Sequence, residues 1–263
     1  MKNLFIKSQD GIDIHCLVSE PKTTALIFVH GWLGNANWWN HQQVYFEKTY
    51  RVVQIDLPGR GQSGNGRKKW SSTQYAYDIK AVADSIEAEK IILIGHSMSG
   101  PYVLEASLMI PQTKMVVLVD TLKNMDQLMN YQQANKLLFT AYRNDFSEAI
   151  KQLLPKFLYS PATPISIIKQ LEYEFLRSTP EYAIDSIGPL YKMAITEIAK
   201  QIQIPVRAIN SDLTPTIKSS LKKYLKNFEF EVIPGTGHYP MLEKPNEFNV
   251  ALEKILREVS ESI

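Results

Sequence analysis

The sequence has few cysteines, little excess positive charge and no long apolar run. Many cysteines, a large positive charge and a long apolar run are typical of disulfide-rich or metal-thiolate, nucleic-acid-binding and membrane-spanning proteins, respectively. Cys16 is the single cysteine, which excludes an internal disulfide and a thiolate metal cluster. The 29 Lys and Arg residues against 27 Asp and Glu residues leave a formal net charge of +2, too small a bias to attract nucleic acid or an anionic membrane surface. There is no run of about 18 apolar residues, so we expect no membrane span.

The N-terminal segment also lacks a targeting pattern. Residues 1–10 have no long apolar core and no small-residue cleavage site, so we expect no signal peptide and a cytoplasmic protein. Hydrophobic residues make up 44% and charged residues 21% of the 263 residues, which is ordinary globular usage. The length predicts one large domain, with or without an insert.

Short apolar runs alternate with helical stretches in both the first and the last part of the chain. Such runs, apolar on both faces and separated by helices, predict an α/β fold with a parallel sheet covered on two sides. An antiparallel hairpin of 4–7 and 12–18 comes first, around a Gln-Asp-Gly turn. The predicted strands are 25–29, 51–55, 91–94, 115–119, 206–209 and 228–233, and the helices 38–48, 73–87, 97–109, 214–225 and 245–259.

The middle of the chain differs in composition from the rest. Only one of the 12 glycines, Gly188, lies between 122 and 199, and strand-like runs vanish there. Apolar residues recur at helical spacing, punctuated by prolines. We therefore predict that residues 1–121 and 200–263 form the core, and that 122–199 is an inserted helical cap of about four helices.

Three separate segments carry residues of nucleophilic catalysis. Segment 95–100, GHSMSG, follows a buried strand and opens a helix, which places the Ser97 hydroxyl at a sharp turn. A serine needs a base that titrates near neutrality, and His238 follows a strand in a glycine-flanked loop. Segment 30–34, HGWLG, follows another strand, and we expect the backbone N–H groups of Trp32 and Met98 to form an oxyanion hole.

The orienting carboxylate has two candidates. Asp212 follows the strand at 206–209, which gives the order Ser97, Asp212, His238 along the chain, and we favour it. Asp120 is the rival, because it ends the strand after the nucleophile helix, at the start of the predicted insert. The sequence leaves this choice open.

With these segments the chain resembles a cap-bearing serine member of the α/β-hydrolase superfamily over nearly its whole length. The resemblance rests on segments 30–34, 95–100 and 237–240 and on the DLPGRGQS stretch at 56–63, where we expect Asp56 to pair with Arg60. It implies eight strands with the second antiparallel, helices on both faces and a cap after the sixth strand. No His, Asp or Glu cluster has metal-ligand spacing and no Gly-x-Gly-x-x-Gly follows a strand, so we expect no metal and no cofactor. The fifth motif position departs from the family pattern, with Ser99 in place of glycine.

The predicted activity is hydrolysis of a small, apolar carboxylic ester through an acyl-enzyme. The expected partner is a small-molecule ester, and the choice between monomer and homodimer stays open. Gly31, Trp32 and Tyr239 are the expected substrate-binding residues. The alternatives are a C–C bond hydrolase, an amidase, a proline-releasing peptidase with acidic residues Glu172 and Glu174, or a low-turnover small-molecule receptor. We expect the charge run 67–69 to be a solvated loop.

Overall fold

The fold is built on one large sheet. The computed structural model describes residues 1–261, and these form eight strands in the spatial order β1-β2-β4-β3-β5-β6-β7-β8. The strands are Lys2–Lys7 (β1), Asp13–Val18 (β2), Thr24–Val29 (β3), Arg51–Ile55 (β4), Lys90–His96 (β5), Thr113–Val119 (β6), Val206–Ser211 (β7) and Phe228–Ile233 (β8).

Strand direction matches the expectation. β2 pairs antiparallel with both β1 and β4, whereas every pair from β4 to β8 is parallel. The predicted α/β-hydrolase fold, mostly parallel with an antiparallel second strand, is confirmed. Parallel order brings the carboxyl ends of β5, β6, β7 and β8 to one edge, where loops from distant parts of the chain meet.

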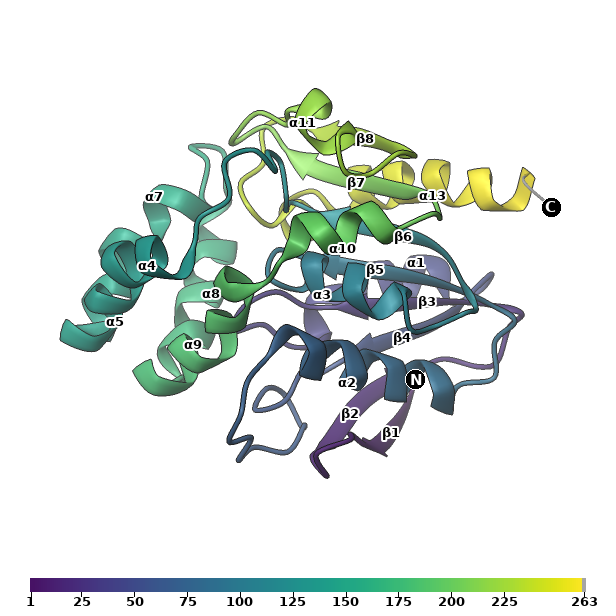
Figure 1. The fold of residues 1–263 in the computed structure, drawn as a ribbon, viewed down its shortest axis with the longest axis horizontal. Coiled ribbons are helices and arrows are strands. Elements are labelled where there is room, and N and C mark those ends of the chain that lie inside the picture. Colours follow the sequence, from purple (N-terminus) through teal and green to yellow (C-terminus); the bar gives the residue numbers. More distant parts are fainter. Residues whose placement is uncertain (262–263) are drawn as a thin grey trace.

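Helices cover both faces of the sheet (Figure 1). One layer contains Ser72–Ser85 (α2), Ser99–Ser107 (α3) and Ile195–Gln201 (α10), and the other contains Asn40–Phe46 (α1), Pro240–Glu243 (α12) and Pro245–Glu261 (α13). A short 3-10 helix, Ala36–Trp39 (η1), precedes α1. Local signals fix the starts of two helices, because the Ser71 hydroxyl accepts from the Gln74 N–H at α2 and Pro245 is the first residue of α13.

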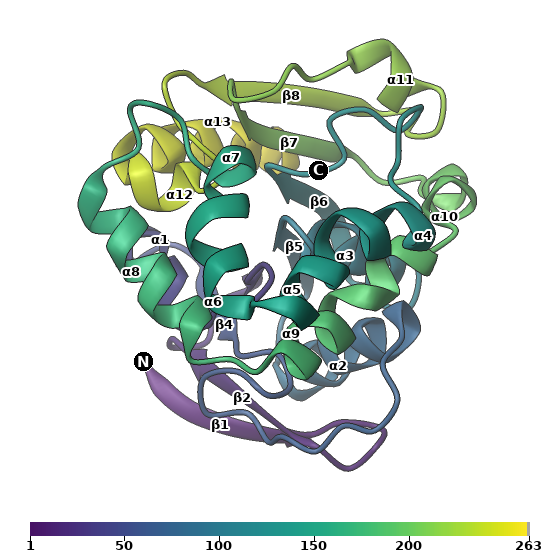
Figure 2. The ribbon, with the colours of Figure 1, turned by 90° about the vertical axis from the view of Figure 1, so that its left-hand side faces the viewer.

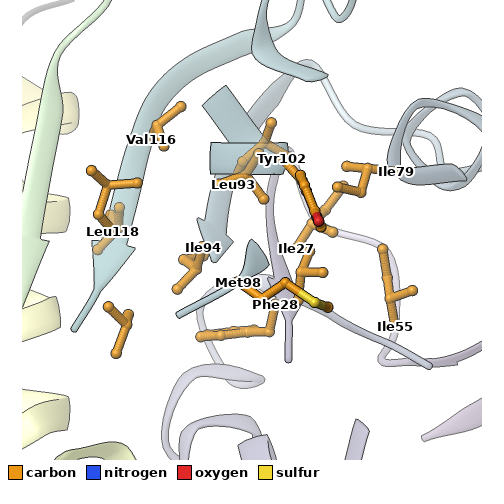
Figure 3. Packing of buried hydrophobic residues seen from close by; sticks show 14 of the residues in the cluster. Ile27, Phe28, Ile55, Ile79, Leu93, Ile94, Met98, Tyr102, Val116 and Leu118 are labelled. Carbon is orange, nitrogen blue, oxygen red and sulfur yellow. The ribbon is translucent and has the colours of Figure 1, made fainter. Parts of the chain in front are cut away.

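The core lies on both faces of the central strands, which explains their continuous apolar runs. Residues 25–29 of β3 are fully buried, as are most residues of β5 and β6. Figure 3 shows Ile27 and Leu93 among side chains of the covering helices, including Ile79 and Tyr102. This packing holds the strand ends, and therefore the loops that follow them, in fixed positions.

The segment between β6 and β7 is helical and lies beside the carboxyl ends of the strands (Figures 1 and 2). Two of its stretches, residues 135–139 and 149–153, are π-helical, a form that occurs often at functional sites. Its elements are Tyr131–Ala134 (α4), Asn135–Phe139 (η2), Thr140–Asn144 (α5), Phe146–Glu148 (α6), Ala149–Leu153 (η3), Pro155–Leu158 (α7), Ile165–Leu176 (α8), Pro180–Ile187 (α9) and Gly188–Lys192 (η4). The division at 122–199 stays a prediction; α10 crosses its end and packs against α3.

Three local expectations are wrong. The helix predicted at 214–225 is limited to Lys218–Lys222 (α11). Arg67 is not solvated but buried, with its guanidinium bonded to Asp78 and Asp10. Asp56 and Arg60 do not pair. Asp56 accepts from His15 and from backbone N–H groups, whereas Arg60 donates to two backbone carbonyls and to the Ser178 hydroxyl.

The described residues contain neither a membrane-spanning helix nor a cluster of metal-binding side chains. In residues 1–261 no helix has the length and apolarity needed to cross a membrane. The same residues bring together no group of three His, Cys, Asp or Glu side chains able to hold a metal ion. Cys16 is buried in β2 as a free thiol, and burial raises its pKa above the ordinary range.

Candidate active site

Ser97 stands on a strained turn between β5 and α3. Its φ of +52° lies in the left-handed region, which non-glycine residues seldom adopt. The turn is tight because the helix starts directly against the strand: a Cβ on Gly95 would lie 2.6 Å from the Ser99 carbonyl oxygen. A strained conformation of this kind persists where the surrounding structure enforces it. Here the conformation of the turn directs the serine side chain outward at the edge of the sheet.

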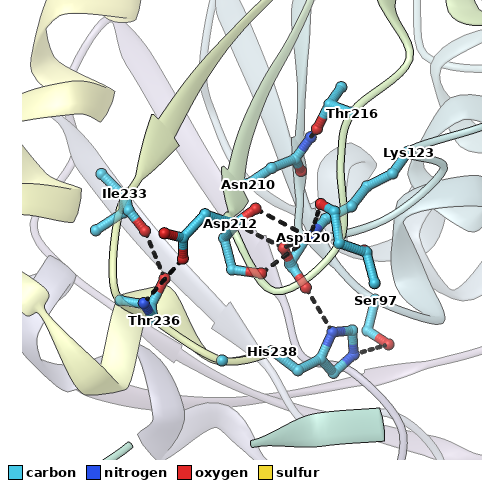
Figure 4. Close-up of polar contacts among 12 residues, drawn as sticks. Ser97, Asp120, Lys123, Asn210, Asp212, Thr216, Ile233, Thr236 and His238 are labelled. Atoms are coloured by element: carbon cyan, nitrogen blue, oxygen red, sulfur yellow. Dashed lines mark hydrogen bonds and ion pairs between the residues drawn. The ribbon is translucent and has the colours of Figure 1, made fainter. Parts of the chain in front are cut away.

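His238 reaches Ser97 from the loop after β8. The Ser97 hydroxyl lies 2.7 Å from His238 Nε2 (Figure 4). The histidine backbone is held as well, since its N–H donates to the Leu158 carbonyl at 2.7 Å. Glu243 accepts from the N–H groups of Gly237 and Tyr239 on either side of the histidine. The structure thus brings together the two residues predicted as nucleophile and base.

Asp120 is the carboxylate bonded to this histidine. Its Oδ2 lies 2.7 Å from His238 Nδ1, and its Oδ1 accepts from the Ser211 N–H at 2.6 Å. Burial would raise the pKa of Asp120, but the hydrogen bond and charge of His238 and the charge of Lys123 outweigh it and hold this pKa well below its usual range. The φ of Asp120 is +46°, so the carboxylate is held on a strained turn like that of Ser97.

Asp212, the favoured acid, occupies a different position. Its carboxylate accepts from the N–H of Gly235 at 2.9 Å and of Thr236 at 3.3 Å, and it makes no hydrogen bond to His238 in the structure (Figure 4). The expectation for this residue is therefore corrected. The chain turns away after Ser211, so Asp212 holds the loop that leads to the histidine, while Asp120 from the neighbouring strand contacts the ring.

Two further histidines support the site without joining it. His96 lies beside His238 with ring centroids 4.9 Å apart, and its Nε2 donates to the His238 carbonyl at 2.8 Å. Burial lowers the pKa of His96 to about 3, so it stays neutral. His30 donates from Nδ1 to the Gly31 carbonyl and accepts the Leu57 N–H at Nε2, so both of its ring nitrogens bind the backbone.

The loop after β3 approaches the nucleophile closely. A Cβ on Gly31 would lie 2.5 Å from His96 Nδ1 and 3.1 Å from Ser97 Cβ, so only glycine fits. Within residues 1–261 the N–H groups of Trp32 and Met98 donate to no protein acceptor. Ser99, at the departing motif position, is buried and donates its hydroxyl to the His30 carbonyl, which ties this loop to the turn.

A largely apolar cavity of about 260 Å³ opens onto Ser97 and His238. Trp32 and Tyr239, two of the three predicted substrate-binding residues, line it, and the third, Gly31, does not. Most of its remaining wall comes from the helical segment between β6 and β7. These residues are Met129, Leu137, Leu138, Tyr142, Leu154, Phe157, Leu158, Ile187 and Tyr191. The site can therefore hold an apolar group beside a hydroxyl that is bonded to a base.

Hydrogen bonds join the helices α8 and α9 to the core loops beside the cavity. Glu174 accepts from Trp38 Nε1 at 2.7 Å and from Asn35 Nδ2 at 3.0 Å. Trp32 Nε1 donates to the Ala183 carbonyl at 2.8 Å, and the Trp32 ring stacks on Tyr142. The sequence indicated no such role for Glu174, because its partners lie about 140 residues away.

Known proteins resemble this chain across most of its length. The model of the alpha/beta hydrolase family matches residues 26–251. Among curated proteins, a pimeloyl-[acyl-carrier protein] methyl ester esterase from Wigglesworthia glossinidia brevipalpis is 26% identical, over 84% of this chain and 88% of its own. A dihydrolipoyllysine-residue acetyltransferase component of an acetoin cleaving system from Pseudomonas putida is 24% identical over 89% of this chain, which spans 64% of that protein.

A solved structure has the same fold. A thermophilic esterase from Thermogutta terrifontis superposes with a TM-score of 0.83, at 19% identity, covering 98% of this chain and 99% of its own. At that identity the likeness speaks for the arrangement of strands and helices and leaves the substrate open.

Proposed function

Because the chain belongs to the alpha/beta hydrolase family, we propose that it is a serine carboxylesterase in which Ser97, His238 and Asp120 form the catalytic triad. One observation carries the proposal: the unbroken chain of hydrogen bonds from Ser97 Oγ through the His238 ring to Asp120, 2.7 Å at each step. A hydroxyl bonded to an imidazole that a buried carboxylate orients is an arrangement for acyl transfer.

The reaction follows from these contacts. Ser97 Oγ attacks the ester carbonyl carbon while His238 Nε2 takes its proton, and the negative carbonyl oxygen lies against the N–H groups of Trp32 and Met98. The tetrahedral intermediate then releases the alcohol, which His238 protonates. Water, deprotonated by the same imidazole, attacks the acyl-serine and frees the acid. Asp120 keeps Nδ1 protonated and stabilises the imidazolium formed in both halves.

Labelling of the serine tests the proposal. We expect a fluorophosphonate to modify the wild-type chain once, and to leave the Ser97→Ala variant unmodified, as measured by intact-protein mass spectrometry. Ser107, at the C-terminal end of α3 with its hydroxyl bonded to the Leu104 carbonyl, provides the control, because Ser107→Ala should be labelled like the wild type. Hydrolysis of short-chain p-nitrophenyl esters should parallel the labelling. Equal turnover by wild type and Ser97→Ala would rule the proposal out.

The apolar cavity predicts a preference for longer acyl chains. Each CH₂ that enters it leaves water, which contributes up to about 0.8 kcal/mol, or roughly a fourfold gain in kcat/KM. We therefore expect kcat/KM to rise from p-nitrophenyl acetate through butyrate to hexanoate. Leu154 lines the cavity, so Leu154→Trp should abolish this rise and leave hydrolysis of the acetate unchanged. Leu153 does not line the cavity, so Leu153→Trp should keep the rise with chain length. A profile that is flat in the wild type would contradict the assignment of the cavity to the acyl group.

The proline-releasing alternative finds less support. A peptidase of that kind needs a carboxylate free to bind the substrate amine, and Glu174 already accepts two hydrogen bonds from the core. Glu172 does not line the cavity. We therefore favour the ester over the peptide substrate.

A further inference from the structure

A lysine shares the carboxylate that orients the histidine. Lys123 Nζ lies 2.6 Å from Asp120 Oδ1, while His238 Nδ1 lies 2.7 Å from Asp120 Oδ2. The side chains of Lys123 and Asp120 are 11% and 3% exposed, so water screens the pair weakly. The carboxylate therefore faces a positive charge on one oxygen and the imidazole on the other (Figure 4).

The position of the ammonium group is fixed. Lys123 Nζ also donates to the Ser211 hydroxyl at 2.9 Å and to the Ser211 carbonyl at 3.1 Å, both at the end of β7. The turn that carries it is strained on both sides of Thr121, since Asp120 and Leu122 have φ values of +46° and +50°. Three groups, the Asp120 carboxylate and the hydroxyl and carbonyl of Ser211, thus hold the ammonium charge in place, at a cost in backbone strain.

We propose that Lys123 is a positioning residue that acts through Asp120: its charge offsets part of the carboxylate charge, so that His238 remains an unprotonated base to lower pH. This inference rests on the proposed function only in taking His238 as the base. The physical reason is competition, because the negative charge that would stabilise an imidazolium already stabilises an ammonium. In a triad without the lysine, the whole carboxylate charge would favour the protonated ring.

The other groups around His238 cannot supply this effect. Ser97 and Tyr239 are neutral neighbours, and His96, at 4.9 Å between ring centroids, is kept neutral by its burial. Glu243 and Asp212 are acidic and bind backbone N–H groups of the histidine loop. Among the ion pairs of residues 1–261, the pair with Lys123 is the one that joins a Lys or Arg to Asp120.

Titration of the His238 ring by ¹⁵N NMR tests the inference without any substrate. The His238→Gln variant assigns the signal. In Lys123→Met the midpoint should move up by about one pH unit, the order of the interaction between two charges a few ångströms apart in a partly buried site. Lys123→Arg keeps the positive charge and should change the midpoint little. Lys223→Met is the matched control, since Lys223 pairs with the exposed Asp126 instead.

Kinetics of fluorophosphonate labelling give a second readout. The pH midpoint of the acidic limb of the labelling rate should move up by the same amount in Lys123→Met. Lys123→Gln replaces this variant if Lys123→Met does not fold. In Lys123→Arg the midpoint should return to its wild-type position. If Lys123→Met lowers the labelling rate but leaves the pH midpoint of the acidic limb unchanged, or if the NMR midpoint is unchanged, Lys123 has a structural role only and the inference is wrong. Failure of the wild type to label at any pH would instead count against the proposed function, and the NMR titration would still stand on its own.

Discussion

Replacing Asp120 with Asn is expected to lower kcat for ester hydrolysis by about 10⁴-fold, while Asp212→Asn lowers it less than about tenfold. Among the carboxylates of residues 1–261, Asp120 is the one hydrogen-bonded to the His238 ring, at 2.7 Å from Nδ1. A neutral amide there cannot stabilise the imidazolium, and its NH₂ group can hold the ring in the tautomer that leaves Nε2 unable to accept the serine proton. Asp212 touches only backbone N–H groups, so its loss loosens a loop.

The comparison is made on kcat with a p-nitrophenyl ester, on the pH plateau of the wild-type rate, with circular dichroism as the check on folding. Both substitutions exchange the same groups directly after neighbouring strands, β6 and β7, so each is the control for the other. The reverse result, a severe loss in Asp212→Asn and a mild one in Asp120→Asn, would mean that the two loops rearrange when substrate binds. It would restore the acid first favoured on the sequence.

The fold and two of the three hydrogen-bonded residues can be predicted from the sequence because each has a strong local signal. Buried strands are apolar on both faces, and their ends carry glycine, serine or histidine in short motifs. Ser97 and His238 each follow such a strand, and parallel order alone brings those ends together. The distance between them is a consequence of topology, which the alternation of elements already indicates.

The choice between Asp120 and Asp212 has no such signal. Both follow a strand, and β6 and β7 are neighbours, so the topology places both carboxylates at the same edge. What separates them is the direction in which each chain leaves its strand. The left-handed φ of Asp120 turns its side chain toward His238, and nothing in the residue type reveals that conformation, since the position is not glycine.

Buried charges are a second place where local sequence misleads. Arg67 stands in a run of three basic residues, which is typical of a solvated loop, yet its side chain is 1% exposed. Its partners are Asp78 on α2 and Asp10 in the β1–β2 turn. Contacts between residues 11 and 57 positions apart leave no periodic trace in the sequence. The same holds for Glu174 and its two partners in the loop after β3.

Asp78→Ala is expected to lower the free energy of unfolding by about 3–5 kcal/mol, which is the cost of removing one partner of a buried ion pair. Asp78 accepts two hydrogen bonds from Arg67, at 2.7 and 2.8 Å, and its own side chain is 0% exposed. Asp10→Ala is the matched control. Its carboxylate binds the same guanidinium but is 28% exposed, so its loss should cost about 1 kcal/mol or less. Urea unfolding followed by tryptophan fluorescence measures both.

The double variant Arg67→Met, Asp78→Leu separates the charge from the packing. If the loss in Asp78→Ala comes from an unpaired buried guanidinium, removing both charges and keeping apolar volume should recover most of it, because the desolvation cost disappears with the ions. The Met side chain would still pack against Trp70 and Tyr75, over whose rings the guanidinium lies at 5.5 and 5.8 Å. A double variant no more stable than Asp78→Ala would show instead that the ion pair itself holds the loop between β4 and α2.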